Sequence, residues 1–222
     1  MKTIIMTLSW ICLTAFAQEI KTEKTYETET YKNRIKTFRE EGLEKNGIIF
    51  LGNSLTQGGD WDTWFPAHKP ANRGISGDNT EGVLARLDEI TNAKPVKLFL
   101  MIGINDISQN YNNDYLCKNF EKIIRKILTE SPETSIYIQS ILPVNNDFGR
   151  YKKLINKEKQ IENLNIRLKK LCKKENIRYV NLYPLFLQNK RKLNPAYTTD
   201  GLHLNEKGYQ VWIGGIRSLI EE

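Results

Sequence analysis

The feature of this 222-residue sequence that most constrains its fold is a regular alternation between short apolar runs and longer amphipathic segments. The apolar runs carry β-branched residues and end near Gly or Pro, which is typical of buried parallel strands. They cover residues 48–51, 97–102, 135–142 and 177–182. Apolar residues at helical spacing predict helices over 31–44, 78–90, 113–130, 153–175 and 205–220. Strands that alternate with helices of this length predict an α/β fold with a parallel sheet and right-handed crossovers.

The domain organisation follows from the same alternation. No internal repeat or Pro/Gly-rich linker interrupts it, so we predict a single domain over 31–222. Residues 18–30 are polar and lack periodicity, which is typical of an N-terminal tail.

The first 17 residues carry the signs of a targeting segment. Lys2 precedes an apolar run that ends in Ala15-Phe16-Ala17, and this pattern predicts a cleavable signal peptide over 1–17. The run is too short for a stable membrane span, and a buried N-terminal helix is the alternative interpretation. We therefore expect an exported protein, periplasmic or secreted, without stable membrane insertion.

The net charge bears on which class of partner the protein binds. The formal net charge is +7, and the excess of Lys and Arg lies mainly in 150–178. A nucleic-acid surface is one interpretation, but the solvated face of a helix is favoured because no aromatic residues are interleaved. We expect no nucleic-acid partner.

Cys117 and Cys172 remain after the predicted cleavage. The first lies near the start of one predicted helix and the second near the end of the next, roughly 20 Å apart along parallel axes. That is too far for a disulfide, so we predict two unpaired thiols.

Groups suited to acyl transfer follow the predicted strands. Because the carboxyl ends of parallel strands meet at one edge of a sheet, these groups should lie together. Ser54 follows the first strand, and a serine hydroxyl is a weak nucleophile until a base takes its proton. His203 is the candidate base, because Asp200 lies three residues earlier and can orient its imidazole on one turn. His68, the other histidine, has no adjacent carboxylate and is interpreted as an exposed loop residue.

A tetrahedral intermediate also needs hydrogen-bond donors for its oxyanion. The candidates are the N–H of Ser54 at a helix start, the N–H of Gly74, and the side-chain amide of Asn105. Each could singly be a cap or a turn residue, but their joint occurrence at one sheet edge favours a catalytic site. No metal cluster, phosphate loop or dinucleotide motif is visible, so we expect no metal and no cofactor.

Four segments of the chain, in order between about 46 and 215, resemble the four conserved blocks of the SGNH/GDSL hydrolase family. They are Gly52-Asn53-Ser54-Leu55-Thr56, Arg73-Gly74-Ile75-Ser76-Gly77, Gly103-Ile104-Asn105-Asp106 and Asp200-Gly201-Leu202-His203. The resemblance implies a flavodoxin-like three-layer α/β/α sandwich with Ser54, Asp200 and His203 as catalytic residues. It also implies an oxyanion hole formed by Ser54, Gly74 and Asn105.

One position departs from the family pattern. Asn53 stands where the family usually has Asp, and it keeps an acceptor oxygen but loses the charge. The amino-acid sequences of the blocks resemble those of a bacterial subgroup near platelet-activating-factor acetylhydrolases and sialate or other sugar O-acetylesterases.

The substrate is indicated only by the residues around these blocks. Trp61 and Trp64 could wall a small acyl pocket or stack on a sugar, with packing of their loop onto the core as the alternative. Asn145, after the fourth strand, could add a polar contact. No long apolar lid is visible. We expect a serine esterase that acts on a small-molecule or glycan ester and removes small acyl groups, most readily O-acetyl groups from a carbohydrate such as sialic acid or a plant or host glycan. A lysophospholipase, a thioesterase or a carbohydrate-binding module without turnover is the alternative, and the oligomeric state stays open.

Overall fold

The computed structural model describes residues 24–188 and 191–222. Within these ranges, five strands form a parallel sheet in the order β2-β1-β3-β4-β5. They are β1 (Ile48–Gly52), β2 (Ala71–Gly74), β3 (Lys97–Met101), β4 (Ser135–Gln139) and β5 (Arg178–Val180). This is the flavodoxin-like order, so the predicted fold class is confirmed. The edge strand β2 has no apolar run, because only part of it is buried.

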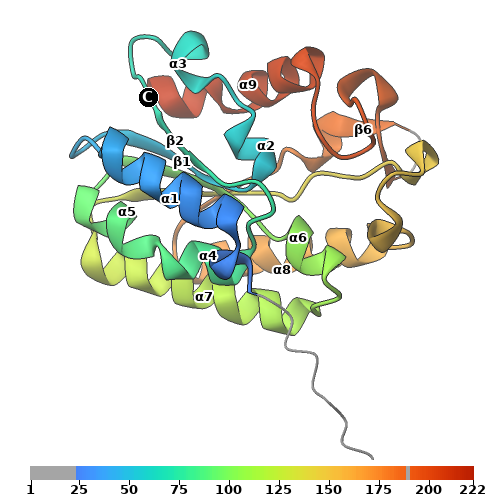
Figure 1. Cartoon of the computed structure of the whole chain (residues 1–222), viewed down its shortest axis with the longest axis horizontal. Helices are drawn as coiled ribbons and strands as arrows, with labels where there is room; N and C mark the ends of the chain where they lie inside the picture. Colours follow the sequence, from blue (N-terminus) through green and yellow to red (C-terminus); the bar gives the residue numbers. More distant parts are fainter. Residues whose placement is uncertain (1–23, 189–190) are drawn as a thin grey trace, which may run out of the picture.

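Helices cover both faces of the sheet and make three layers (Figure 1). One face carries α4 (Thr80–Ala85), α5 (Leu87–Ala93), α7 (Asn113–Glu130) and α8 (Glu158–Lys174), with α1 (Glu29–Glu41) beside α4 and α5. The opposite face carries α3 (Trp61–Trp64) and α9 (Glu206–Glu221). The short helices α2 (Ser54–Gln57) and α6 (Ile104–Ser108) follow β1 and β3 directly.

The remaining elements are short. A hairpin pairs β6 (Leu187–Gln188) with β7 (Lys192–Leu193). The 3-10 helices are η1 (Thr25–Glu27), η2 (Asn146–Phe148), η3 (Lys152–Leu154), η4 (Tyr183–Phe186) and η6 (Pro195–Tyr197). Across the described ranges, no helix combines the length and apolar character needed to cross a membrane.

The two faces of the sheet have different cores. The face toward α7 and α8 is filled mainly by Ile and Leu side chains. The face toward α9 is aromatic, with Phe50 stacked between Trp61 and Phe99 at ring-centroid distances of 3.9 and 5.0 Å. Trp212 of α9 closes this cluster against Trp61. The aromatic layer fixes α3 and α9 against the sheet.

The N-terminal boundary of the domain differs from the prediction. The 3-10 helix η1 begins at Thr25 and α1 begins at Glu29, so residues 25–30 belong to the folded domain and not to a tail. The Thr25 hydroxyl donates to the side-chain oxygen of Asn79 at 2.9 Å, which attaches this segment to the loop before α4. The predicted signal peptide over 1–17 lies outside the described residues.

The helix predicted over 78–90 is divided in two at Arg86, whose backbone leaves helical geometry. The Arg86 side chain is only 3% exposed and forms an ion pair with Asp78 at 2.8 Å. It also donates to the backbone carbonyls of Gly52 at 3.0 Å and Arg73 at 2.8 Å. One guanidinium therefore holds the carboxyl ends of β1 and β2 and the loop before α4.

Cys117 and Cys172 are both unbridged, but not for the predicted reason. The bond from Asn113 to the carbonyl of Gln160 at 3.0 Å and the ion pair between Lys174 and Glu121 at 3.8 Å show that the start of α7 lies beside the start of α8, and the middle of α7 beside the end of α8. The separation of the two cysteines along the helix axes is therefore well below the predicted value of roughly 20 Å. Cys172 is buried in the core, and Cys117 is half-buried against the same core.

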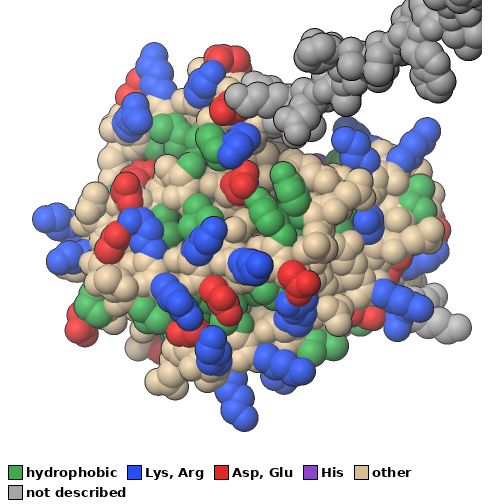
Figure 2. Space-filling view, turned by 90° about the horizontal axis from the view of Figure 1, so that it is seen from below, with side chains coloured by type: hydrophobic (Ala, Val, Ile, Leu, Met, Phe, Trp, Pro, Cys, Tyr) green, Lys and Arg blue, Asp and Glu red, His purple; other side chains and the backbone are tan. Residues whose placement is uncertain are grey.

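The surface over α5, α7 and α8 mixes charges of both signs (Figure 2). Lys and Arg side chains stand among Asp and Glu, and some pair across neighbouring helices, as Arg167 does with Asp114 at 2.7 Å. The mixture is typical of a solvated helix face, and the lack of a nucleic-acid partner stays a prediction.

Replacing Arg86 by Met should lower the free energy of unfolding by about 3–5 kcal/mol, because the buried Asp78 carboxylate loses its partner. Arg39 of α1 is exposed, and Arg39→Met is the matched control, with an expected change within about 0.5 kcal/mol. Urea unfolding followed by tryptophan fluorescence measures both variants. An Arg86→Met protein as stable as the control would contradict the role given to this ion pair.

Candidate active site

Ser54 is the first residue of α2 and follows β1 after a tight turn. The turn needs glycine at position 52, because a Cβ there would lie 2.4 Å from the carbonyl oxygen of Met101. The buried Asn53 side chain accepts a hydrogen bond from the N–H of Leu55 at 3.0 Å and caps the helix. A neutral amide suits this position, since a buried carboxylate without a cation would be costly. The N–H of Ser54 itself donates to no group among the described residues.

Three side chains form a continuous hydrogen-bonded chain at this edge of the sheet. Ser54 Oγ lies 3.0 Å from His203 Nε2, and His203 Nδ1 lies 2.9 Å from Asp200 Oδ2. The second Asp200 oxygen accepts the backbone N–H groups of Leu202 at 3.0 Å and His203 at 2.8 Å. The carboxylate is thus fixed from two sides, and it faces the imidazole as the sequence predicts.

The turn that carries Asp200 and His203 has its own support. The Thr198 hydroxyl donates to the carbonyl of His203 at 2.7 Å and accepts the N–H of Gly201 at 2.9 Å. Gly201 has φ +89°, and a Cβ on it would lie 2.2 Å from the carbonyl oxygen of Asn145. The turn therefore requires glycine both for its backbone angle and for its contact with the loop after β4.

Hydrogen bonds keep Asp200 ionised. Burial alone would raise its pKa, but the bonds from the His203 side chain and N–H, from Tyr151 and from the Leu202 N–H lower the pKa to about 2. The carboxylate can therefore orient the imidazole and stabilise its charged form across the neutral and mildly acidic range.

Tyr151 is a member of this cluster that the sequence analysis did not identify. Its hydroxyl lies 2.8 Å from Asp200 Oδ2 and 2.9 Å from His203 Nδ1. Burial and the neighbouring Asp200 raise the pKa of this hydroxyl to about 12, so it stays protonated at neutral pH. Its place after β4, at the carboxyl edge of the sheet, was the available signal, but no pattern distinguishes Tyr151 from other polar residues there.

The structure corrects one predicted oxyanion donor. The N–H of Gly74 already donates to the Asn72 side chain at 3.0 Å, and a Cβ on Gly74 would lie 2.2 Å from the backbone nitrogen of Gln57. Gly74 is thus a close contact between β2 and α2. Gly77, three residues later, is exposed with φ +80°, has open space around it, and has an N–H without a partner among the described residues. Gly77 is therefore the better candidate donor.

Asn105 is hydrogen-bonded to Asp78, the residue that follows Gly77. Its side-chain amide donates to the carbonyl of Asp78 at 2.7 Å, which leaves the second amide hydrogen for another acceptor. The next residue, Asp106, is buried and accepts the N–H of Thr80 at 3.1 Å, which ties α6 to the start of α4. Burial raises the pKa of Asp106 to about 7. The candidate donors are thus the N–H groups of Ser54 and Gly77 and the amide of Asn105.

The predicted substrate contacts of the two tryptophans are not supported by their positions. Trp61 is 1% exposed, stacks on Phe50 and donates its indole N–H to the carbonyl of Thr56 at 2.9 Å. Trp64 is half-buried and packs edge-on against Trp61 at 5.5 Å. Trp61 therefore belongs to the core, which was the alternative interpretation.

Asn145 is also used in internal hydrogen bonds. It is buried, its side-chain amide donates to the carbonyl of Leu193 at 2.9 Å, and its N–H donates to the carbonyl of Gly201 at 2.8 Å. Asn145 supports the turn of the candidate base and does not face a substrate.

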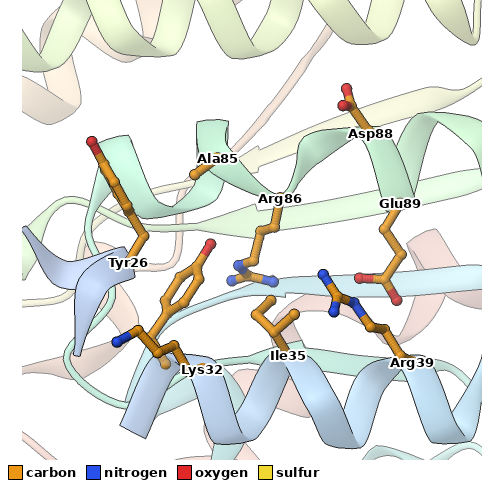
Figure 3. Close-up of a pocket in the computed structure, with 9 residues that line it drawn as sticks. Tyr26, Lys32, Ile35, Arg39, Ala85, Arg86, Asp88 and Glu89 are labelled. Carbon is orange, nitrogen blue, oxygen red and sulfur yellow. The ribbon is translucent and has the colours of Figure 1, made fainter. Parts of the chain in front are cut away.

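The site lies at the carboxyl edge of the sheet, apart from the cavity between α1 and the α4–α5 pair. A cavity of about 520 Å³ opens between α1 and the α4–α5 pair, where Arg39, Arg86 and Glu89 project toward one another (Figure 3). No residue of the Ser54–His203–Asp200 chain lines it. The His203 side chain is 37% exposed, so an ester can approach it from solvent. In the described parts of the chain, no group of three or more His, Cys, Asp or Glu side chains is arranged to hold a metal ion.

Comparison with known proteins places the chain among hydrolases. Residues 50–211 match the model of the GDSL-like lipase/acylhydrolase family. The N-acylneuraminate cytidylyltransferase of Escherichia coli is 28% identical over 201 residues, which cover 85% of this chain. They cover 44% of that relative, so the chain spans less than half of its length.

Two solved structures of bacterial proteins share the fold. A candidate acylhydrolase of Bacteroides fragilis has a TM-score of 0.77 and 25% identity, covering 87% of this chain and 97% of its own. A GDSL-like lipase of Bacteroides thetaiotaomicron has a TM-score of 0.75 and 27% identity, covering 85% and 96%.

Replacing Gly201 by Ala should displace the turn that carries His203. Gly149, with φ +68° and nothing within 4 Å of the position that a Cβ would take, is the matched control for the backbone angle alone. Gly149→Ala should cost about 1 kcal/mol of unfolding free energy, and Gly201→Ala at least about 1–3 kcal/mol more, because of the contact with Asn145. Urea unfolding of both proteins checks this, and equal losses would show that the close contact is relieved without cost.

Proposed function

The chain belongs to the GDSL-like lipase/acylhydrolase family, and we propose that it is a serine esterase that removes small acyl groups, above all O-acetyl groups of a carbohydrate. The observation that carries this proposal is the chain of contacts from Ser54 Oγ to His203 Nε2 and from His203 Nδ1 to Asp200, at 3.0 and 2.9 Å. A nucleophile within reach of a base that a carboxylate orients is the arrangement that acyl transfer requires.

In the proposed mechanism, Ser54 Oγ attacks the ester carbonyl while its proton passes to His203 Nε2. The oxyanion accepts hydrogen bonds from the N–H groups of Ser54 and Gly77 and from Asn105. The tetrahedral intermediate collapses, the C–O bond to the alcohol breaks, and His203 returns the proton to the leaving oxygen. Water, activated by the same imidazole, then hydrolyses the acyl-enzyme and restores Ser54.

Two observations favour an acidic sugar ester as the substrate. The E. coli relative is named for N-acylneuraminate, an acidic acylated sugar. The chain has a formal net charge of +7, which favours the approach of an anionic substrate.

The loop next to the catalytic turn offers suitable contacts. Phe148 is 42% exposed, and its Cβ lies 3.2 Å from the position that a Cβ on Gly201 would take. Arg150, two residues later, is also exposed. An aromatic face and a cation near the catalytic turn suit a sugar ring that carries a carboxylate. Export to the periplasm or medium is part of the proposal and rests on the sequence of residues 1–17.

The substrate is tested by measuring acetate release from O-acetylated sialic acid, acetylated xylan and acetylated rhamnogalacturonan, with Ser54→Ala as the blank. p-Nitrophenyl acetate and a long-chain p-nitrophenyl ester give the preference for acyl length. We expect the highest kcat/KM on acetylated sialic acid and a strong preference for acetyl. A preference for the long chain would instead favour a lipase or lysophospholipase.

Ser54→Ala and His203→Ala should each lower kcat on p-nitrophenyl acetate by at least about 10³-fold, because nucleophile and base act as one unit. His68→Ala is the matched control for removing a histidine, since His68 is exposed and outside the site, and it should keep full activity. Near-normal turnover by Ser54→Ala, free of contaminating esterase, would rule out this mechanism.

The rate should fall in acid through a single ionisation. Because the pKa of Asp200 is lowered to about 2, its carboxylate stays ionised above about pH 4, and only protonation of His203 removes the base. On the acid side of the profile, log kcat/KM should therefore rise with pH with a slope of one. Stopped assays at constant ionic strength measure this profile. A slope near two would mean that a second essential group titrates, and a flat profile would exclude a histidine base.

A further inference from the structure

Tyr151 approaches the candidate base from the loop between β4 and α8. Its ring meets the His203 ring edge-on at 5.8 Å, and the exposed Arg150 guanidinium lies 6.0 Å from the centre of the Tyr151 ring. The Tyr151 hydroxyl, His203 Nδ1 and Asp200 Oδ2 form a closed triangle with sides of 2.8, 2.9 and 2.9 Å. Each of the three atoms is within hydrogen-bond distance of the other two.

The protons in this triangle can be assigned. A tyrosine hydroxyl has one proton, and the ionised Asp200 is the stronger acceptor, so the hydroxyl donates to Asp200. Its lone pair then faces His203 Nδ1. The reverse arrangement, with the hydroxyl donating to Nδ1, would put the histidine proton on Nε2, where Ser54 could no longer give up its own proton.

We propose that Tyr151 is a positioning residue that, together with Asp200, holds His203 in the tautomer protonated at Nδ1. Two acceptors face this N–H, so Nε2, which lies 3.0 Å from Ser54 Oγ, stays unprotonated and can accept the Ser54 proton. The effect of Tyr151 on the reaction rate rests on the proposed esterase function, whereas the effect of Tyr151 on the His203 tautomer does not.

The variant Asp200→Asn separates the two acceptors. Asn keeps the oxygen that accepts the N–H groups of Leu202 and His203, so the turn is preserved. It replaces the oxygen that faces His203 by an NH₂ group, which only donates. In this variant the Tyr151 hydroxyl is the remaining acceptor for the Nδ1 proton within the cluster. In the double variant Asp200→Asn/Tyr151→Phe, the cluster has no acceptor for the Nδ1 proton.

Nuclear magnetic resonance tests the tautomer directly. The chain has two histidines, so ¹⁵N-labelled wild type and His68→Gln assign the His203 ring nitrogens without ambiguity. At a pH where the imidazole is neutral, we expect His203 to be protonated at Nδ1 in wild type and in Asp200→Asn. In the double variant, the proton should move largely to Nε2. Movement in Asp200→Asn alone, or no difference between Asp200→Asn and the double variant, overturns the proposal.

Kinetics give a second readout that a purely structural role would not produce. Tyr151→Phe should lower kcat by less than about fivefold in wild type, with KM unchanged, but by an additional tenfold or so in Asp200→Asn. Tyr183→Phe is the matched control, because its hydroxyl also bonds a carboxylate, that of Glu162 at 3.4 Å, outside the catalytic cluster. It should have no effect in either background.

An equal factor for Tyr151→Phe in both backgrounds would mean that Tyr151 only supports its loop, which overturns the positioning role. If wild type shows no Ser54-dependent hydrolysis, the proposed function fails, and the position of the His203 proton still decides the proposal for Tyr151.

Discussion

The geometry at the carboxyl edge of the sheet depends on the buried ion pair between Arg86 and Asp78. The same guanidinium donates to the carbonyls of Gly52 and Arg73, so β1, β2 and the loop before α4 meet at one cation. The carbonyl of Asp78 in turn accepts the amide of Asn105. Because desolvation offsets much of the attraction, a buried pair of this kind contributes little net stability. The ion pair fixes the position of the turn before Ser54 relative to two candidate oxyanion donors, Gly77 and Asn105.

The two halves of the site are supported in different ways. The nucleophile and the oxyanion donors lie directly at strand ends, whereas His203 comes from a turn outside the sheet. That turn needs Thr198 to bond its backbone, Gly201 to pass close to Asn145, and Tyr151 to approach the imidazole. Since a displacement of about 1 Å at a base is enough to weaken proton transfer, this support from the loop after β4 is part of the active site.

Much of this arrangement follows from sequence, because strand ends in a parallel sheet converge and the chain offers only two histidines. The periodicity predicted α7 with its observed bounds, Asn113–Glu130. It missed the interruption at Arg86, since a single residue leaves helical geometry there to bond two strand ends. The sequence analysis also chose Gly74 over Gly77, because the sequence does not show that the Gly74 N–H is already bonded and that Gly77 is the glycine with open space around it.

The substrate contacts show where sequence reasoning ends. An aromatic residue after a nucleophile helix fits a sugar platform and a core position equally well, and only the stacking on Phe50 assigns Trp61 to the core. The segment after β4 was the correct place to search, but Asn145 is used to hold the catalytic turn. Because these side chains pack inside the protein, the groups that contact the substrate must be ones that stay exposed near the turn that carries His203. Phe148 is one such group, and its loop also carries Tyr151. In the proposed mechanism, the loop that would bind the sugar therefore also orients the base.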